Sequence, residues 1–166
     1  MVVGALLLAA VAVPQLEIAL SAAPARLNVQ LSVQGELPEA WTQALGAGAP
    51  VDLTYRIKLF RNRRFLWDQR QANHELTVKA QRDTLTGSFS LVAELDGEIL
   101  ASGQAETLDL AVHWVTHPPT AEIVVPLRHE PLWLVARCEF LTKYKLLVFP
   151  TTVGTGWVTR AVPESP

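Results

Sequence analysis

The sequence predicts a mainly β protein, an antiparallel β-sandwich of about seven to nine strands with two short helices near 38–46 and 105–117. Apolar and polar residues alternate in runs of five to ten residues, which is the pattern of half-buried strands. Turn sequences separate these runs. Hydrophobic residues make up 49% of the chain and charged residues 18%, a globular composition. At 166 residues the chain can bury a core as one domain.

We divide the chain into a signal-peptide-like or anchor segment at 1–13, a single β-rich domain at 14–162 and a tail at 163–166. The first thirteen residues (MVVGALLLAAVAV) are all apolar or small. They are too few for a membrane-spanning helix, which needs about 20 such residues. They match the apolar core of a secretory signal, and residues 10–12 have the small-x-small pattern of a cleavage site.

The first basic residue is Arg26, so the positively charged leader of a signal is missing. Either the start lies upstream of Met1 or the segment is a buried N-terminal helix. We favour the signal, and expect an exported protein of the periplasm or the membrane-associated cell envelope.

The first elements form a hairpin followed by a helix. Apolar residues alternate over 16–20 and again over 27–33, and the short connection favours antiparallel pairing. At residues 37–45 the period changes to that of a helix, with Pro38 suited to its first turn.

The central strand is predicted at 51–60, where every second residue is apolar, namely Val51, Leu53, Tyr55, Ile57 and Leu59. Strands are expected next at 73–82, 89–95 and 98–101. Asp96-Gly97 between the last two is a tight-hairpin signal, because glycine tolerates the positive φ of such a turn.

Helical spacing returns at 108–117 and stops at Pro118-Pro119. Four further strands are expected at 121–127, 132–140, 145–149 and 156–161, with a turn at 152–156. The one cysteine, Cys138, is in phase with the apolar residues of its strand, so we expect it in the core.

Charge is distributed unevenly. Residues 51–82 hold eight Lys or Arg against three acids, a local charge of +5, whereas residues 83–127 hold seven acids and no Lys or Arg. Strands of opposite charge can pair across a sheet. The net charge of −2 gives no overall attraction to nucleic acid, and no nucleic-acid partner is expected.

The sequence lacks the motifs of nucleophilic catalysis and of phosphate binding, so we predict no catalytic residues, no cofactor and no enzyme activity. Asp96 and Glu98 flank a hairpin tip and are expected to be solvated. His113 and His117 are weak metal candidates, since four-residue spacing places both on one helical face but no third ligand is near.

The candidate binding site follows the central strand, where arginines mix with aromatic residues. Guanidinium groups and aromatic rings have the composition of an interface hot spot, although a basic strand end also discourages aggregation. On a strand, Arg61 would continue the apolar face of Leu59, which would turn basic as it leaves the core. The predicted site comprises Arg61, Arg63, Arg64, Phe65 and Trp67.

Several segments together resemble an uncharacterised domain-of-unknown-function family of small, exported proteobacterial proteins. They are residues 36–41 (ELPEAW) with the helix through Leu45, 48–53 (GAPVDL), 59–61 (LFR) and 67–68 (WD). The resemblance is clearest over 15–95 and extends loosely to the end. It implies a β-rich envelope domain and supplies no activity or catalytic residues.

The leading hypothesis is a non-catalytic, exported domain that contacts another envelope component, either a protein or an anionic lipid surface. The alternatives are a small carrier of a lipid or other apolar ligand, and a hydrolase with dispersed residues. A continuous apolar cavity of several hundred Å³ would favour the carrier. A filled core with an exposed aromatic and basic patch would favour the interaction domain. The sequence does not predict the oligomeric state.

Overall fold

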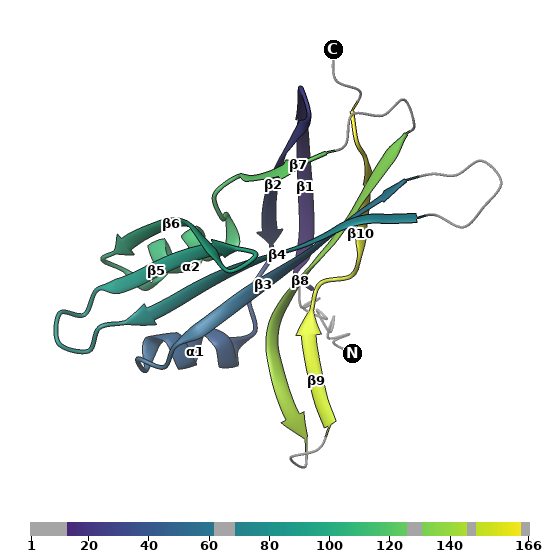
Figure 1. The fold of residues 1–166 in the computed structure, drawn as a ribbon. Coiled ribbons are helices and arrows are strands. Elements are labelled where there is room, and N and C mark those ends of the chain that lie inside the picture. Colours follow the sequence, from purple (N-terminus) through teal and green to yellow (C-terminus); the bar gives the residue numbers. More distant parts are fainter. Residues whose placement is uncertain (1–12, 62–68, 126–130, 146–148, 164–166) are drawn as a thin grey trace, which may run out of the picture.

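The computed structural model describes residues 13–61, 69–125, 131–145 and 149–163. In these residues ten strands form two antiparallel sheets, accompanied by two helices (Figure 1). The smaller sheet has the order β1-β2-β7, with β1 (Gln15–Ala23), β2 (Arg26–Gln34) and β7 (Ala121–Val124). The mainly β, antiparallel, sandwich-like architecture predicted from the sequence is confirmed.

The larger sheet has seven strands in the described part of the chain. Their order is β10-β8-β3-β4-β5-β6, and β9 also pairs with β8. The strands are β3 (Val51–Arg61), β4 (Gln69–Arg82), β5 (Phe89–Leu95), β6 (Glu98–Ala105), β8 (Leu132–Lys145), β9 (Phe149–Gly154) and β10 (Val158–Ala161).

Strand β3 is the centre of the larger sheet, as its alternating sequence predicts. It pairs with β4 along its whole length and with β8 from Thr54 to Arg61. Its apolar residues are at most 6% exposed, from Val51 to Leu59. Burying five such side chains contributes roughly 1.5–3 kcal/mol each, before the cost of ordering the chain.

One face of the larger sheet, the inner face, is covered by two different kinds of structure. The smaller sheet lies against the β8 and β10 side, and the helices α1 (Glu39–Gly46) and α2 (Leu108–Thr116) lie against β3 to β6 (Figure 1). The opposite, outer face carries the half-buried and exposed residues of β3, β4 and β8. The sandwich is therefore closed by helices where the small sheet ends.

Each helix is tied to β3 by a hydrogen bond from a buried aromatic side chain. The indole Nε1 of Trp41 in α1 donates to the carbonyl oxygen of Asp52 (3.1 Å), and the hydroxyl of Tyr55 donates to the carbonyl oxygen of Val115 in α2 (2.7 Å). These bonds satisfy the polar atoms of two large rings that are 0% exposed.

The predicted hairpin turn at Asp96-Gly97 is confirmed, with φ angles of 53° and 86°. Several boundaries differ from the expectation. Strand β6 continues to Ala105, which pairs with Phe89 and is buried, and the Thr107 hydroxyl then caps α2, so the second helix begins at Leu108 rather than at 105. Ten strands are present where about seven to nine were expected. The strand expected at 145–149 is wrong as a single element, because Lys145 ends β8, Phe149 begins β9 and residues 146–148 lie outside the described residues.

Residues 1–12, which contain most of the signal-like segment, lie outside the described residues. Among the helices that are described, neither is long and apolar enough to cross a membrane.

Candidate binding surface

Four residues of the predicted site, Arg63, Arg64, Phe65 and Trp67, lie outside the described residues. Arg61 is the last residue of β3 and pairs with Gln69 of β4 and Leu132 of β8. The register with β8 continues unbroken from Leu59 to Arg61, so Arg61 does continue the apolar face of the strand. A binding role for this group stays a prediction.

A second aromatic and basic surface lies on the outer face of the larger sheet. It combines four cations, two carboxylates and three aromatic rings from neighbouring strands. We call it the outer-face surface, and it comprises Arg56, Lys58 and Phe60 of β3, Arg70 and Glu75 of β4, Trp133, Arg137 and Glu139 of β8, and Trp157 before β10.

Strand register brings these residues together. Arg56 of β3 lies between Glu75 of β4 and Arg137 of β8. Four residues along, Phe60 lies between Arg70 and Trp133. A bulge in β4 between these two levels keeps Arg70 on the same face as Phe60. Directly opposed side chains on one face lie within contact distance, so the surface is continuous across three strands.

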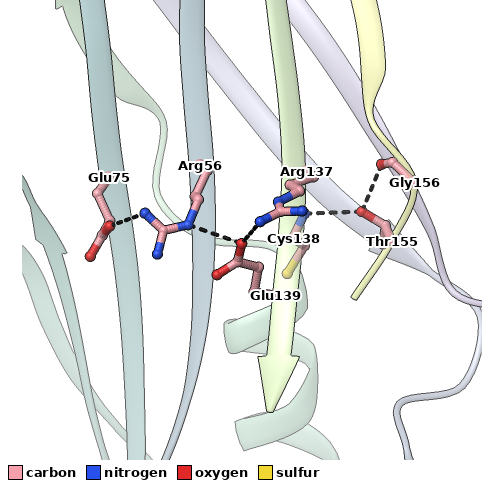
Figure 2. A network of polar contacts seen from close by, with 7 residues as sticks. All are labelled: Arg56, Glu75, Arg137, Cys138, Glu139, Thr155 and Gly156. Atoms are coloured by element: carbon pink, nitrogen blue, oxygen red, sulfur yellow. Dashed lines mark hydrogen bonds and ion pairs between the residues drawn. The ribbon is translucent and has the colours of Figure 1, made fainter. Parts of the chain in front are cut away.

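Arg56 is the centre of an ion-pair network. Its Nη1 lies 2.8 Å from Glu75 Oε2 and its Nε lies 2.9 Å from Glu139 Oε1, which also pairs with Arg137 (Figure 2). The hydrogen bond to Glu139 raises the pKa of Arg56. Glu139 is the most enclosed member, with 12% of its side chain exposed, and it holds two guanidinium groups at once. The network fixes β4, β3 and β8 relative to one another.

Trp157 lies over two of these cations. The Lys58 ammonium nitrogen is 4.5 Å from the centre of the indole ring, and the Arg137 guanidinium carbon is 4.7 Å from it. Both distances are within the range of cation–π attraction. The side chain is 43% exposed, so the ring orders the cations and still presents apolar surface to solvent.

The chain before Trp157 explains its position. The Thr155 amide donates to the Cys138 carbonyl oxygen (2.8 Å), and the Thr155 hydroxyl accepts from the Cys138 amide (2.9 Å) and donates to the Gly156 carbonyl (Figure 2). Between β9 and β10, the buried Thr155 hydroxyl thus replaces a backbone carbonyl as the acceptor for the Cys138 amide. The predicted turn at 152–156 is wrong for residues 152–154, which belong to β9.

The charges on the outer-face surface do not balance. Four cations (Arg56, Lys58, Arg70, Arg137) face two carboxylates (Glu75, Glu139), which leaves a net charge of 4 − 2 = +2. The two carboxylates are held by Arg56 and Arg137. Within the described residues, Lys58 and Arg70 form no ion pair. Among the described residues of the outer-face surface, these two cations are open to an external carboxylate.

The histidines proposed as weak metal candidates stack on each other. Their ring centres are 4.3 Å apart, and Nδ1 of His117 is 3.2 Å from the His113 carbonyl oxygen. In the part of the chain that is described, no group of three or more His, Cys, Asp or Glu residues is placed to hold a metal ion.

Asp96 is exposed, as expected, and in addition has two hydrogen-bond partners. Its Oδ2 lies 2.6 Å from Nδ1 of His74, and its Oδ1 accepts from the Glu75 amide (2.8 Å). It therefore ties the β5–β6 hairpin to β4. Glu98 is exposed, as expected.

Cys138 is 0% exposed, as its phase in the strand predicts. Burial raises the pKa of its thiol well above the usual range, and the pKa of the neighbouring Tyr55 hydroxyl is raised by burial and by Cys138. A buried thiol that stays protonated is a core residue rather than a nucleophile.

A hollow of about 420 Å³ lies at the other end of the outer face. It is lined by residues at the start of β3, the end of β4 and the facing part of β5, including Pro50, Asp52, Lys79, Gln81 and Val92. Its position is on the sheet surface rather than between the layers, and exposed charged residues form part of its wall.

Two antiparallel sheets of unequal size, with two helices covering the rest of the larger sheet's inner face, define a small, two-layer β domain. The chain belongs to the family described as a domain of unknown function (DUF4390), whose match covers residues 9–130. This match confirms the expected membership of a domain-of-unknown-function family. The comparison with curated proteins and the comparison with solved structures find no match.

The family match ends before β8. Trp133, Arg137, Glu139 and Trp157 therefore lie beyond it, while the β3 and β4 residues of the outer-face surface lie within it. The alternation that assigns Cys138 to the core also assigns Arg137 and Trp133 to the opposite face of β8, but the sequence analysis did not connect these two residues with each other or with Trp157. That shared face was the available signal.

Proposed function

We propose that this chain is a non-catalytic, exported domain that works by binding another protein of the cell envelope through the outer-face surface. The observation that carries this proposal is the half-exposed Trp157 ring, ordered by Lys58 and Arg137 on a sheet face that the rest of the described chain leaves open.

The composition of the surface supports a protein partner. Tryptophan and arginine are the residues most enriched at interface hot spots. Trp133 is 37% exposed and Trp157 is 43% exposed, so both can lose apolar area to a partner. Trp133 lies on a hydrogen-bonded strand, and Trp157 follows Thr155, which is hydrogen-bonded to the Cys138 backbone. Both positions limit the entropy that binding would cost.

Export rests on the sequence of residues 1–13, whose apolar run resembles the core of a secretory signal. Fractionation of the producing cells tests it directly. We expect the protein in the envelope fraction, and full-length protein in the cytosol would contradict export.

The hollow supports a second candidate function, a carrier of a small apolar ligand. Its volume of about 420 Å³ falls within the range of small-molecule sites, and Pro50 and Val92 supply apolar wall. Val92→Arg would fill it. If the carrier function is correct, that variant loses binding of a fluorescent fatty acid while Trp157→Ala keeps it.

Site-specific photo-crosslinking tests the interaction function. A photoreactive amino acid replaces Thr159, which is exposed on β10 opposite Val135 and so on the outer face. The matched control places the same group at Gln30, exposed on β2 of the smaller sheet. Cells are irradiated intact and adducts are separated by mass.

We expect one discrete protein adduct from position 159 and none of the same mass from position 30. Adding Trp157→Ala should reduce the adduct at least about fivefold, because hot-spot truncation typically costs more than 1 kcal/mol. Equal adducts from the two positions, or an adduct insensitive to Trp157→Ala, would contradict the proposal.

A further inference from the structure

We infer that the outer-face surface recognises an acidic protein segment, with carboxylates on Lys58 and Arg70 and an apolar side chain on Phe60 and Trp133. This inference rests on the proposed function and adds the chemistry of the partner to it.

The charge balance selects a carboxylate partner. Arg56 and Arg137 are already neutralised by Glu75 and Glu139, whereas Lys58 and Arg70 form no ion pair in the described part of the chain. Two cations without carboxylates on one face attract an oppositely charged patch and fix its register.

The two cations are suitably spaced. Lys58 pairs with Asn73, while Arg70 lies on the neighbouring strand beside Phe60, two residues further along β3. Strand spacing and rise place their Cα atoms about 8 Å apart. Carboxylates at alternate positions of an extended chain are separated by about 7 Å, which long Lys and Arg side chains accommodate.

Trp157 pre-organises one of these cations. With its ammonium 4.5 Å from the ring centre, Lys58 has an ordered head group before a partner arrives. Ordering a long side chain in advance lowers the cost of binding. The ammonium has three N–H donors, so those directed away from the ring can reach a carboxylate.

The small excess of positive charge favours a protein partner over an anionic membrane or a nucleic acid. Stable attraction to an anionic membrane typically takes a cluster of about four to eight Lys or Arg, and nucleic-acid binders contact about six to ten phosphates. The described surface has an excess of two, and Glu75 and Glu139 would repel a dense row of phosphates. One or two carboxylates on a protein segment match it.

The aromatic residues specify what lies between the carboxylates. Phe60 lies between Arg70 and Trp133, so an apolar strip adjoins the cation pair. Trp133 remains 37% exposed. An acidic segment with interspersed apolar side chains would cover this strip and leave its carboxylates at the cations.

Two short synthetic peptides test the inference on the full chain. In one, Glu alternates with Tyr and Val; in the other, every Glu is replaced by the isosteric Gln. Affinity is measured by calorimetry at low and physiological salt. We expect the Glu peptide to bind at least roughly tenfold more tightly and to weaken as salt rises.

The combined substitution Lys58→Glu and Arg70→Glu should reduce binding of the Glu peptide at least about tenfold and create binding of a matching Lys peptide. The control, Arg160→Glu, reverses an exposed charge of β10 on the opposite parity from Thr159 and should leave the affinity unchanged. Circular dichroism checks the fold, and the salt dependence of the wild-type chain tests the inference if the double variant does not fold.

Equal affinity for the Glu and Gln peptides overturns the acidic-segment inference. So does binding to phosphatidylglycerol vesicles or to a single-stranded oligonucleotide in place of the Glu peptide. These results leave the proposed protein interaction to be judged by the crosslink at position 159. A different result would overturn the proposed function alone. In that case Trp157→Ala would not reduce the crosslink at position 159, while the chain would still bind the Glu peptide.

Discussion

Gly154 lies against Cys138 so closely that a Cβ atom on Gly154 would stand 2.3 Å from the Cys138 carbonyl oxygen. This close approach brings the edge chain against β8 before Thr155 makes two hydrogen bonds with the Cys138 backbone, one through its amide and one through its hydroxyl. The glycine is therefore needed for space, and the position of Trp157 three residues later depends on it.

Gly154→Ala is expected to displace the edge chain. The clash is with backbone, including the Glu139 Cα at 3.1 Å, so no flexible side chain can relieve it. We expect a loss of about 1–3 kcal/mol in the free energy of unfolding, measured by urea denaturation.

Gly156→Ala is the matched control, since nothing lies within 4 Å of a Cβ at that position. Its effect should stay within about 0.5 kcal/mol. Equal losses for the two variants would show that close approach is not the role of Gly154.

Glu139→Gln should destabilise the domain more than Glu75→Gln does. Glu139 is 12% exposed and holds both Arg56 and Arg137, whereas Glu75 is 46% exposed and holds Arg56 alone. We expect about 1–3 kcal/mol for Glu139 and less than about 1 kcal/mol for Glu75, by thermal or urea unfolding. The reverse order would mean that enclosure does not set the strength of these pairs.

Alkaline pH should weaken the domain through Cys138. Burial raises the pKa of the folded thiol above its ordinary value of 9.0, so this contribution is complete below pH 9 and is lost as pH rises. At pH 10 the loss is expected to be about 1 kcal/mol.

Urea unfolding at pH 8 and pH 10 measures this loss, with Cys138→Ala as the control. The variant should have a lower free energy of unfolding at pH 8, because it lacks the buried sulfur. Its further decrease between pH 8 and pH 10 should be smaller than that of the wild type by the contribution of Cys138. An identical decline in both proteins would exclude Cys138 as its source.

Asp83 should contribute to acid sensitivity. Hydrogen bonds from the Leu85 and Thr86 amides to its carboxylate lower its pKa below the ordinary 3.8. Its contribution is therefore present above pH 3.8 and is lost as pH falls through the lower pKa of the folded state. The stability difference between wild type and Asp83→Ala should shrink as pH is lowered in that window; a constant difference would contradict this role.

Local sequence was sufficient for the buried face of the main strands and for the tight turn at Asp96-Gly97. Alternation with a period of two assigns Val51 to Leu59 to one face whatever the partners of the strand are. Asp96-Gly97 specifies its turn because both residues tolerate positive φ, and the structure has φ angles of 53° and 86° there. The buried Cys138 followed from the same alternation.

Local sequence was insufficient where elements begin, end or meet. The second helix begins at Leu108 because β6 continues to pair with β5 as far as Ala105, a contact between strands rather than a local preference. The unequal covering of the inner face by a small sheet and two helices likewise depends on how separate elements pack.

The sequence by itself determined the class of fold and the core face of each main strand. Only the tertiary structure decided that Lys58, Arg137 and Trp157 lie together on one surface. They lie on three separate segments, brought together by the antiparallel register of β3 with β8 and by the passage of Gly154 and Thr155 along β8. Register is set by the packing of whole sheets, so no local pattern around Trp157 could specify which cations it would contact.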